Sequence, residues 1–303
     1  MVSSVIDDIK STFRSGNMIS KIIVVNVAFY IIIKLVWVFT QGGQGIYPII
    51  EHGLSLPSDP SKLIRQPWSL FTHMFLHAGF FHIFMNMLML YWFGQIVGDL
   101  LGDERVLPIY LMAGLFGGLV YILHDLFLPG GTNGNAYALG ASAAVMAVIW
   151  SAAMTSPDYN MRLLLLGNVR LKYIALALLF MDLIGTAGDI NKGGHWAHLG
   201  GAAFGIFYVY MLRRGTDLTG PWTRIMDRSK NKSSRYSQKV EKTPRSKFRV
   251  VHNTRDSDDN EAPKAAFDQQ EELDRILDKI KAQGYDKLTD EEKDFLYRAS
   301  KKK

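Results

Sequence analysis

The sequence predicts an all-α, polytopic membrane protein in which a six-helix bundle is followed by a polar tail. Six apolar segments occur within residues 1–212, and long stretches of this region carry almost no charge. Residues 1–212 hold 11 Lys and Arg against 11 Asp and Glu, so the formal net charge of +6 arises in residues 213–303. The basic balance therefore belongs to the tail and does not indicate a nucleic-acid partner. The chain has no cysteine, which excludes disulfide scaffolds, thiolate metal sites and cysteine nucleophiles.

Each apolar segment meets or approaches the roughly 20 residues that a helix needs to cross the hydrocarbon core. The segments are Ile22–Phe39, Phe71–Val97, Val106–Phe127, Tyr137–Met154, Leu163–Thr186 and Trp196–Leu212. The first is not expected to be a cleavable signal peptide, because Thr40, Gln41 and Gly42 follow it instead of a small-x-small cleavage site. Six such segments in succession favour a bilayer as their surroundings over the interior of a soluble protein.

Basic residues that flank the segments predict the orientation of the bundle. Lys10, Arg14 and Lys21 precede the first segment, and Arg213 and Arg214 follow the sixth. Basic residues concentrate on the cytoplasmic side, and an even number of spans returns the chain to the side on which it started. We therefore expect a multi-pass protein of the bacterial inner membrane with both termini in the cytoplasm.

Composition divides the chain into four parts. We expect a cytoplasmic N-terminal segment at residues 1–20, the six-helix domain at 21–214, a disordered basic linker at 215–262 and a small cytoplasmic helical segment at 263–303. The linker would lie where anionic lipids of the inner leaflet attract it.

The last part has the pattern of a small helical hairpin. A helical stripe of apolar residues is formed by Leu273, Ile276, Leu277 and Ile280. Gly284 is expected to end this helix, and Thr289 with Glu292 forms a capping-box pattern that would start the next one. The apolar face is too small to be very stable alone. It is compatible with docking to a cytoplasmic partner, which the sequence does not identify.

Four polar side chains from three spans are expected at similar depths below the outer surface. Counted by helical rise from Tyr137, Ser142 lies ~8 Å down, and counted from Gly194, His198 lies ~6 Å down. If the core of the second span begins near Ala78, His82 and Asn86 lie ~6 and ~12 Å down. Polar groups at membrane depth are costly and usually face inward or carry function. A serine hydroxyl beside a neutral histidine base is sufficient for covalent acyl transfer. His82 and Asn86, spaced i, i+4, could donate hydrogen bonds to a developing oxyanion.

Each of these residues also has a purely structural interpretation. Ser142, within Gly140–Ala143, could pack with its hydroxyl bonded to the carbonyl four residues back. His82, Asn86 and His198 could each bond a neighbouring helix. The small residues that share a helix face with His198 are Gly194, Gly201, Ala202 and Gly205. Such a face permits close helix approach and would bring the imidazole near its neighbour.

The motifs His73-x3-His77-x4-His82-x3-Asn86, Gly140-x-Ser142 and Ala197-His198-Leu199-Gly200-Gly201 together resemble those of the rhomboid intramembrane serine proteases. The resemblance covers about residues 22–212, with the motifs in the family's order. It implies a six-helix rhomboid fold, Ser142 as nucleophile and His198 as general base. It implies His82, Asn86 and the Ser142 backbone N–H as oxyanion stabilisers, and a role for the His73/His77 region in holding the first outer loop and water. Its substrates would be transmembrane proteins in the lipid bilayer, and it implies no cofactor and no metal.

Three positions depart from the family pattern. Ala143 stands where the family usually has a glycine after the serine. Met146 stands four residues after the serine, where many members have a tyrosine that packs on the catalytic imidazole. Ser69 follows Trp68 where many members have an arginine in the first loop. None of these departures removes a catalytic group.

Other interpretations stay open. Asp182 in the fifth span could complete a triad, but the resemblance supplies no third carboxylate, so we expect a Ser-His dyad. A hydrogen bond between Asp182 and His198 would overturn that expectation. His73 and His77 have the i, i+4 spacing of a metal pair.

Two alternative functions also stay open. A catalytically inactive rhomboid-like protein would bind client transmembrane helices without cutting them. A channel or transporter would need a continuous polar path, whereas the inner halves of the spans look apolar.

Overall fold

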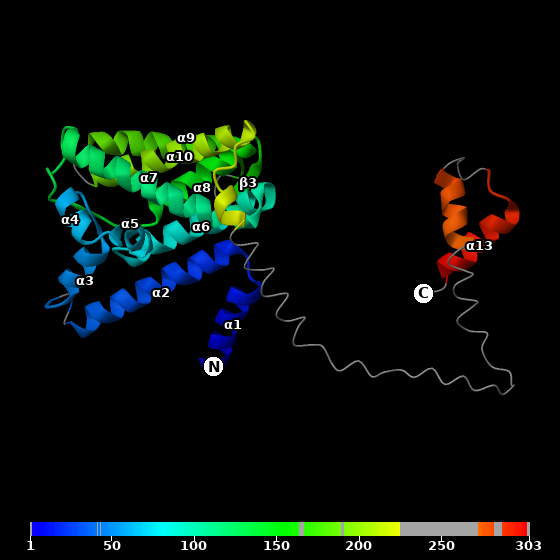
Figure 1. Ribbon diagram of the computed structural model, residues 1–303, viewed down its shortest axis with the longest axis horizontal. Helices are drawn as coiled ribbons and strands as arrows, with labels where there is room; N and C mark the ends of the chain where they lie inside the picture. The colour runs from blue at the N-terminus through cyan, green and yellow to red at the C-terminus, as the bar shows by residue number, and fades with distance from the viewer. Residues whose placement is uncertain are drawn as a thin grey trace. The chain divides into compact units, whose positions relative to one another are not determined.

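The computed structural model describes residues 2–40, 42, 44–163, 167–188, 191–224, 272–281 and 287–301. The chain forms two compact units, Met1–Glu241 and Lys242–Lys303. In chain order the first unit contains α1 (Val2–Ser15), α2 (Met18–Phe39), α3 (Tyr47–Leu54), β1 (Leu56–Pro57), α4 (Pro60–Arg65), α5 (Ser69–Thr72), η1 (His73–Phe75), α6 (Phe80–Leu101), η2 (Asp103–Arg105), α7 (Val106–Phe127), β2 (Tyr137–Ala138), α8 (Ser142–Thr155), β3 (Asn160–Leu163), β4 (Gly167–Arg170), α9 (Leu171–Ala187) and α10 (Lys192–Arg213) (Figure 1).

Three helices of the described part are long and apolar enough to cross a membrane. The candidate spans are Met18–Phe39, Phe80–Leu101 and Asp103–Phe127. Helix α8 is apolar but has only 14 residues, most of them buried inside the bundle. Helix α10 has 22 residues but is less apolar, because it contains Lys192, His195, His198 and several glycines. The chain is therefore a mostly helical membrane protein with at least three apolar spans, and the count of six remains a prediction.

In three of the expected spans, the helix begins later in the sequence than hydropathy predicts. Residues 71–79 form the end of α5, the η1 turn and an extended stretch, so α6 starts at Phe80. The strands β3 and β4 form a two-stranded antiparallel sheet, so α9 starts at Leu171 instead of Leu163. The fourth span begins with β2, and its helix α8 starts at Ser142. Hydropathy cannot separate such lead-in segments from a helix, because their apolar residues are also partly buried.

The connection between α2 and α6 folds onto the bundle. Strand β1 pairs antiparallel with β2, which immediately precedes the segment that carries Ser142. The Trp68 indole N–H donates to the Gly53 carbonyl at 2.7 Å, and the Thr72 hydroxyl donates to the Leu54 carbonyl at 2.6 Å. These bonds fix the loop internally, and the strand pair attaches it to the entrance of α8.

Helix α10 packs against α7, α8 and α9 (Figure 1). A Cβ added at Gly201 would lie 2.0 Å from the Ala143 carbonyl oxygen, and one at Gly205 would lie 2.4 Å from the Ala147 carbonyl oxygen. Glycine is therefore required at both positions for α10 to approach α8 this closely. The small-residue face predicted for this helix is confirmed, and it brings α10 into direct backbone contact with α8.

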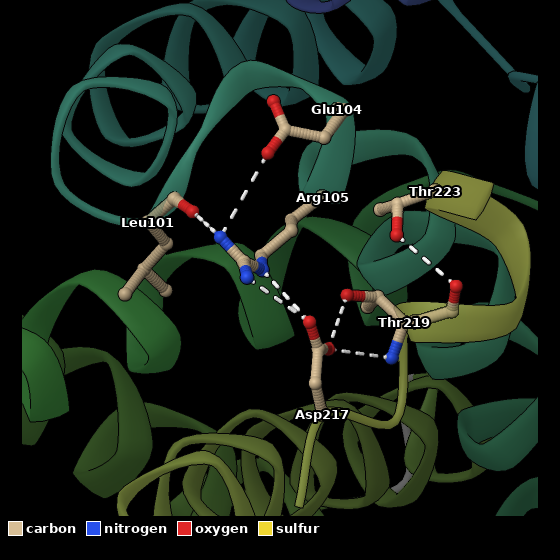
Figure 2. A network of polar contacts seen from close by, with 7 residues as sticks. Leu101, Glu104, Arg105, Asp217, Thr219 and Thr223 are labelled. Carbon is tan, nitrogen blue, oxygen red and sulfur yellow. Dashed lines mark hydrogen bonds and ion pairs between the residues drawn. The ribbon is translucent and has the colours of Figure 1, made fainter. Parts of the chain in front are cut away.

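A polar network joins the start of α7 to the segment that follows α10 (Figure 2). The Arg105 guanidinium donates to Asp217 Oδ2 from Nη2 at 3.0 Å and from Nε at 3.2 Å. Asp217 Oδ1 accepts from the Thr219 backbone N–H at 2.9 Å and from its hydroxyl at 2.5 Å. Arg105 also donates to the Leu101 carbonyl, so the network reaches the last turn of α6.

In the second unit, residues 272–281 are helical and α13 spans Asp290–Lys301. Both hydrogen bonds of the predicted capping box are present: the Thr289 N–H donates to Glu292 Oε2 at 2.8 Å, and the Glu292 N–H donates to the Thr289 hydroxyl at 3.3 Å. Lys279 pairs with Glu292 at 2.8 Å and ties the two helical segments together. Gly284 and residues 225–271, which include most of the expected basic linker, lie outside the described residues.

Candidate active site

Ser142 is the first residue of α8 and is reached through a tight backbone turn. Gly140, two residues earlier, has φ +131°, a backbone conformation that residues other than glycine rarely adopt. A Cβ at Gly140 would also lie 2.9 Å from the His82 ring and 3.6 Å from Ser142 Oγ. The Gly140 N–H donates to the His73 carbonyl at 2.9 Å. The glycine therefore leaves room for the His82 imidazole beside the serine.

The serine and histidine predicted from the sequence are brought into direct contact. Ser142 Oγ lies 2.7 Å from His198 Nε2, although the two residues belong to different helices. His198 Nδ1 lies 2.8 Å from Asp182 Oδ1. When Nδ1 carries the proton and donates to the carboxylate, Nε2 is left as an acceptor for the serine hydroxyl. In this tautomer, His198 Nε2 is directed at the Ser142 hydroxyl as a hydrogen-bond acceptor.

The expected Ser-His dyad requires correction, because the structure adds a carboxylate to it. Asp182, only 6 % exposed, projects from α9 toward the N-terminal half of α10 and accepts the hydrogen bond of His198. The arrangement is therefore Ser142–His198–Asp182. A buried carboxylate in an otherwise apolar helix needs a partner, and His198 meets that need.

His195 was missed by sequence reasoning. Its Nδ1 lies 2.8 Å from the same Asp182 Oδ1 that binds His198, and the two imidazole rings are in edge contact with centroids 5.9 Å apart. The signal was present in the sequence as an i, i+3 spacing, which places both histidines on one face of α10. Among the described residues, Asp182, His195 and His198 are the group with ligand atoms close enough to hold a metal, all within 4.8 Å.

A cavity of about 870 Å³ surrounds the serine. The residues predicted for the site line it together with the new carboxylate: Ser142, His198, His82, Asn86 and Asp182. The Asn86 side-chain amide donates to the His82 carbonyl at 2.8 Å, within the same helix. The His82 ring lies against that of His77 at a centroid distance of 5.1 Å. Both predicted oxyanion residues thus face the same cavity as Ser142, without a direct hydrogen bond to it among the described contacts.

The departures from the family pattern have visible surroundings. Gly117 of α7 leaves the space that the Ala143 methyl occupies, because a Cβ at Gly117 would lie 2.6 Å from that methyl. Met146 is buried and lines the same cavity as His198. Ser69 is buried, and its carbonyl accepts a 2.8 Å hydrogen bond from His73 Nδ1. This bond lies within the first loop, and the His73 carbonyl, which accepts from the Gly140 N–H at 2.9 Å, attaches the loop to the segment before α8.

A model of the rhomboid domain matches residues 64–215, and a model described as a family of unknown function (DUF6576) matches residues 263–302. The fold, the apolar spans and the serine site thus define a multi-pass membrane protein of a class whose members are mostly intramembrane serine proteases. The chain belongs to the rhomboid family.

Curated relatives support this membership. The mitochondrial presenilin-associated rhomboid-like protein of Homo sapiens is 33 % identical over 168 residues, which cover 53 % of this chain and 41 % of the relative. The mitochondrial RHOMBOID-like protein 12 of Arabidopsis thaliana is 30 % identical over 162 residues, covering 48 % and 47 %. The Rhomboid-related protein 1 of Caenorhabditis elegans is 29 % identical over 187 residues, covering 57 % and 50 %. The chain spans half or less of the length of these relatives.

Proposed function

We propose that this chain is an intramembrane serine endopeptidase that hydrolyses peptide bonds in or near transmembrane segments of other membrane proteins. The observation that carries the proposal is the chain of contacts from Ser142 Oγ to His198 Nε2 at 2.7 Å and from His198 Nδ1 to Asp182 Oδ1 at 2.8 Å. A nucleophile, a base and a group that orients the base recur in this order in acyl-transfer enzymes on unrelated folds.

In the proposed first step, Ser142 Oγ attacks the carbonyl carbon of the scissile peptide bond while its proton moves to His198 Nε2. The imidazolium that forms is stabilised by the Asp182 carboxylate. His198 then gives the proton to the leaving amine, the C–N bond breaks, and an acyl-enzyme remains on Ser142. Water then enters the cavity and attacks the ester carbonyl while its proton moves to His198 Nε2. The bond between the acyl carbon and Oγ breaks, His198 returns the proton to Ser142 Oγ, and the new carboxyl terminus is released.

The negative charge that develops on the carbonyl oxygen has three candidate donors. The Ser142 backbone N–H begins α8 and so has no partner within that helix. Asn86 uses one amide hydrogen within its own helix and keeps the other, and the His82 ring lies beside Gly140 at the edge of the serine turn. Donors placed around the oxyanion stabilise the transition state more than the substrate.

The substrate class follows from the surroundings of the serine. The cavity is lined by residues of α6 to α10, including apolar side chains such as Met85, Met89 and Leu178, so an apolar segment fits it. A peptide carbonyl inside an intact helix is already bonded and shielded. Helix-breaking residues near the scissile bond should therefore favour cleavage. The orientation with both termini in the cytoplasm, the bacterial inner membrane and the four-part domain division belong to this proposal.

The test is cleavage of a single-span membrane reporter reconstituted with the wild-type protein, Ser142→Ala and His198→Ala. We expect cleavage by the wild type and its loss, by about 10⁴-fold or more, in both variants. Cleavage that survived both substitutions would refute the assignment. Binding of the reporter without any cleavage by the wild type would favour an inactive rhomboid-like protein instead.

A further inference from the structure

Helix α9 has few buried residues in its half nearest the serine. Of its 17 residues, the buried ones are Leu171, Ala175 and Asp182. The first two lie at the end far from Ser142, so beyond Ala175 the single buried residue of this helix is a carboxylate. The apolar side chains that follow Asp182 are exposed: Leu183 is 50 % exposed and Ile184 is 59 % exposed. Leu178 and Leu179, between Ala175 and Asp182, pack against the core but are only partly buried, so apolar packing holds this half of α9 less firmly than the far end.

The carboxylate of Asp182 supplies a further attachment. One of its oxygens, Oδ1, accepts hydrogen bonds from His195 and from His198, each at 2.8 Å. Both histidines belong to α10, which is packed deeply against α7 and α8. Among the described residues these are the side-chain hydrogen bonds from this half of α9 to another helix. Two donors on one oxygen fix the direction of the carboxylate, whereas a single donor would leave it free to turn.

The position of His195 is matched by a glycine on α9. A Cβ at Gly185 would lie 2.4 Å from His195 Nε2 and 2.5 Å from its Cδ2, so the imidazole lies directly on the α9 backbone. Gly185 is three residues after Asp182 and therefore on the same face of the helix. The His195 ring thus contacts α9 at two points, the Asp182 carboxylate and the Gly185 backbone. His198 contacts α9 at the Asp182 carboxylate.

We propose that His195 is a positioning residue that holds the Asp182 carboxylate, and with it the near half of α9, against the imidazole of His198. The inference rests on the proposed hydrolase function, in which His198 needs an acceptor at Nδ1 to remain a base toward Ser142. It adds a consequence for the helices. When the near half of α9 moves away from α10, Asp182 separates from His195 and His198 at the same time. The Ser142–His198–Asp182 arrangement therefore exists only while this half of α9 is packed against α10.

Two substitutions of His195 separate its hydrogen bond from its bulk. His195→Phe keeps a planar ring but has no donor. His195→Asn places an amide nitrogen the same number of bonds from Cα as Nδ1, so the donor to Asp182 is kept. For reporter cleavage we expect kcat to fall on the order of 10- to 100-fold in His195→Phe with KM almost unchanged, because a misplaced base slows the chemical step. We expect His195→Asn to restore most of kcat.

A distance measurement tests the anchoring without relying on activity. The chain has no cysteine, so spin labels can be attached at introduced cysteines in the otherwise wild-type protein. Exposed positions Ile184 on α9 and Leu123 on α7 report on the near half, and Tyr173 on α9 with Leu100 on α6 serves as the control pair. We expect His195→Phe to broaden and lengthen the near-half distances and leave the control pair unchanged. His195→Asn should resemble the wild type in both pairs.

Gly185→Ala provides an independent route to the same displacement, since the added methyl must push the His195 ring aside. It should reproduce the loss of kcat and the lengthened distance even if His195→Phe fails to fold. Wild-type kcat in His195→Phe, or unchanged near-half distances in both His195→Phe and Gly185→Ala, would overturn the proposal. Failure of the hydrolase function itself would look different, because the wild type would then show no Ser142-dependent cleavage while the spin-label distances still responded to His195→Phe.

Discussion

At the scale of single residues, the proposed chemistry depends on three side chains and the hydrogen bonds that connect them. Ser142, His198 and Asp182 come from α8, α10 and α9, and hydrogen bonds of 2.7 and 2.8 Å connect them. Asp182 acts on Ser142 only through the imidazole. Its removal should therefore affect the tautomer and orientation of His198 more than the binding of substrate.

Asp182→Asn is the substitution that distinguishes a triad from a dyad. The amide keeps the size of the carboxylate but cannot stabilise the imidazolium, and it can force His198 into the wrong tautomer. We expect kcat for reporter cleavage to fall on the order of 10²–10⁴-fold with KM little changed. A variant as active as the wild type would return the assignment to a Ser-His dyad.

Asn86→Ala tests the oxyanion assignment. The residue is 7 % exposed and lines the serine cavity, and we expect its loss to lower kcat by about 10²-fold. Met89, on the same helix and lining the same cavity, provides the matched control. If Met89→Ala lowered kcat as much as Asn86→Ala, the effect of Asn86 would reflect cavity shape and the assignment would be wrong.

At the scale of secondary-structure elements, the site depends on the close contact between α8 and α10. Gly201→Ala would place a methyl 2.0 Å from the Ala143 carbonyl oxygen, which is backbone and cannot turn aside. Overpacking of this kind costs about 1–3 kcal/mol of unfolding free energy, so we expect a lower thermal midpoint in detergent together with reduced cleavage. Gly53→Ala, in α3 with nothing within 4 Å of the added methyl, should leave both unchanged.

The link between Arg105 and Asp217 joins the start of α7 to the segment after α10, far along the chain from the serine (Figure 2). Partial burial acts to raise the pKa of the Asp217 carboxyl, but hydrogen bonds from Thr219 and Arg105 outweigh it and hold the pKa below its usual value. The link therefore stabilises the fold above the unfolded-state pKa of this group and is lost as the pH falls through the lower folded-state pKa.

Asp217→Asn should lower the unfolding free energy at neutral pH by about 1–2 kcal/mol, in the lower part of the range for charged hydrogen bonds because the side chain is 26 % exposed. Thermal unfolding of the wild type and the variant across pH 3–7 measures the effect. The difference between the two should shrink toward acid pH. A difference that was constant across that range would contradict the assigned role of the carboxylate.

At the scale of the whole molecule, local patterns predicted the spans, and contacts between distant segments decided the site. Ser142 and His198 could be assigned because each lies in a short motif. Asp182 could not, since its partners are 13 and 16 residues away across a turn whose path the sequence does not give. Hydropathy also placed the start of the second span at Phe71 instead of Phe80, because the loop segment between them is apolar and partly buried.

The central claim is that His198 activates the Ser142 hydroxyl, and covalent labelling with a fluorophosphonate measures that activation most directly. We predict that peptide mapping of the labelled wild-type protein finds the phosphonate on Ser142, and that His198→Ala reacts on the order of 10³-fold more slowly under the same conditions. Labelling of Ser142 at the same rate in His198→Ala, or its absence from the folded wild-type protein, would contradict the claim.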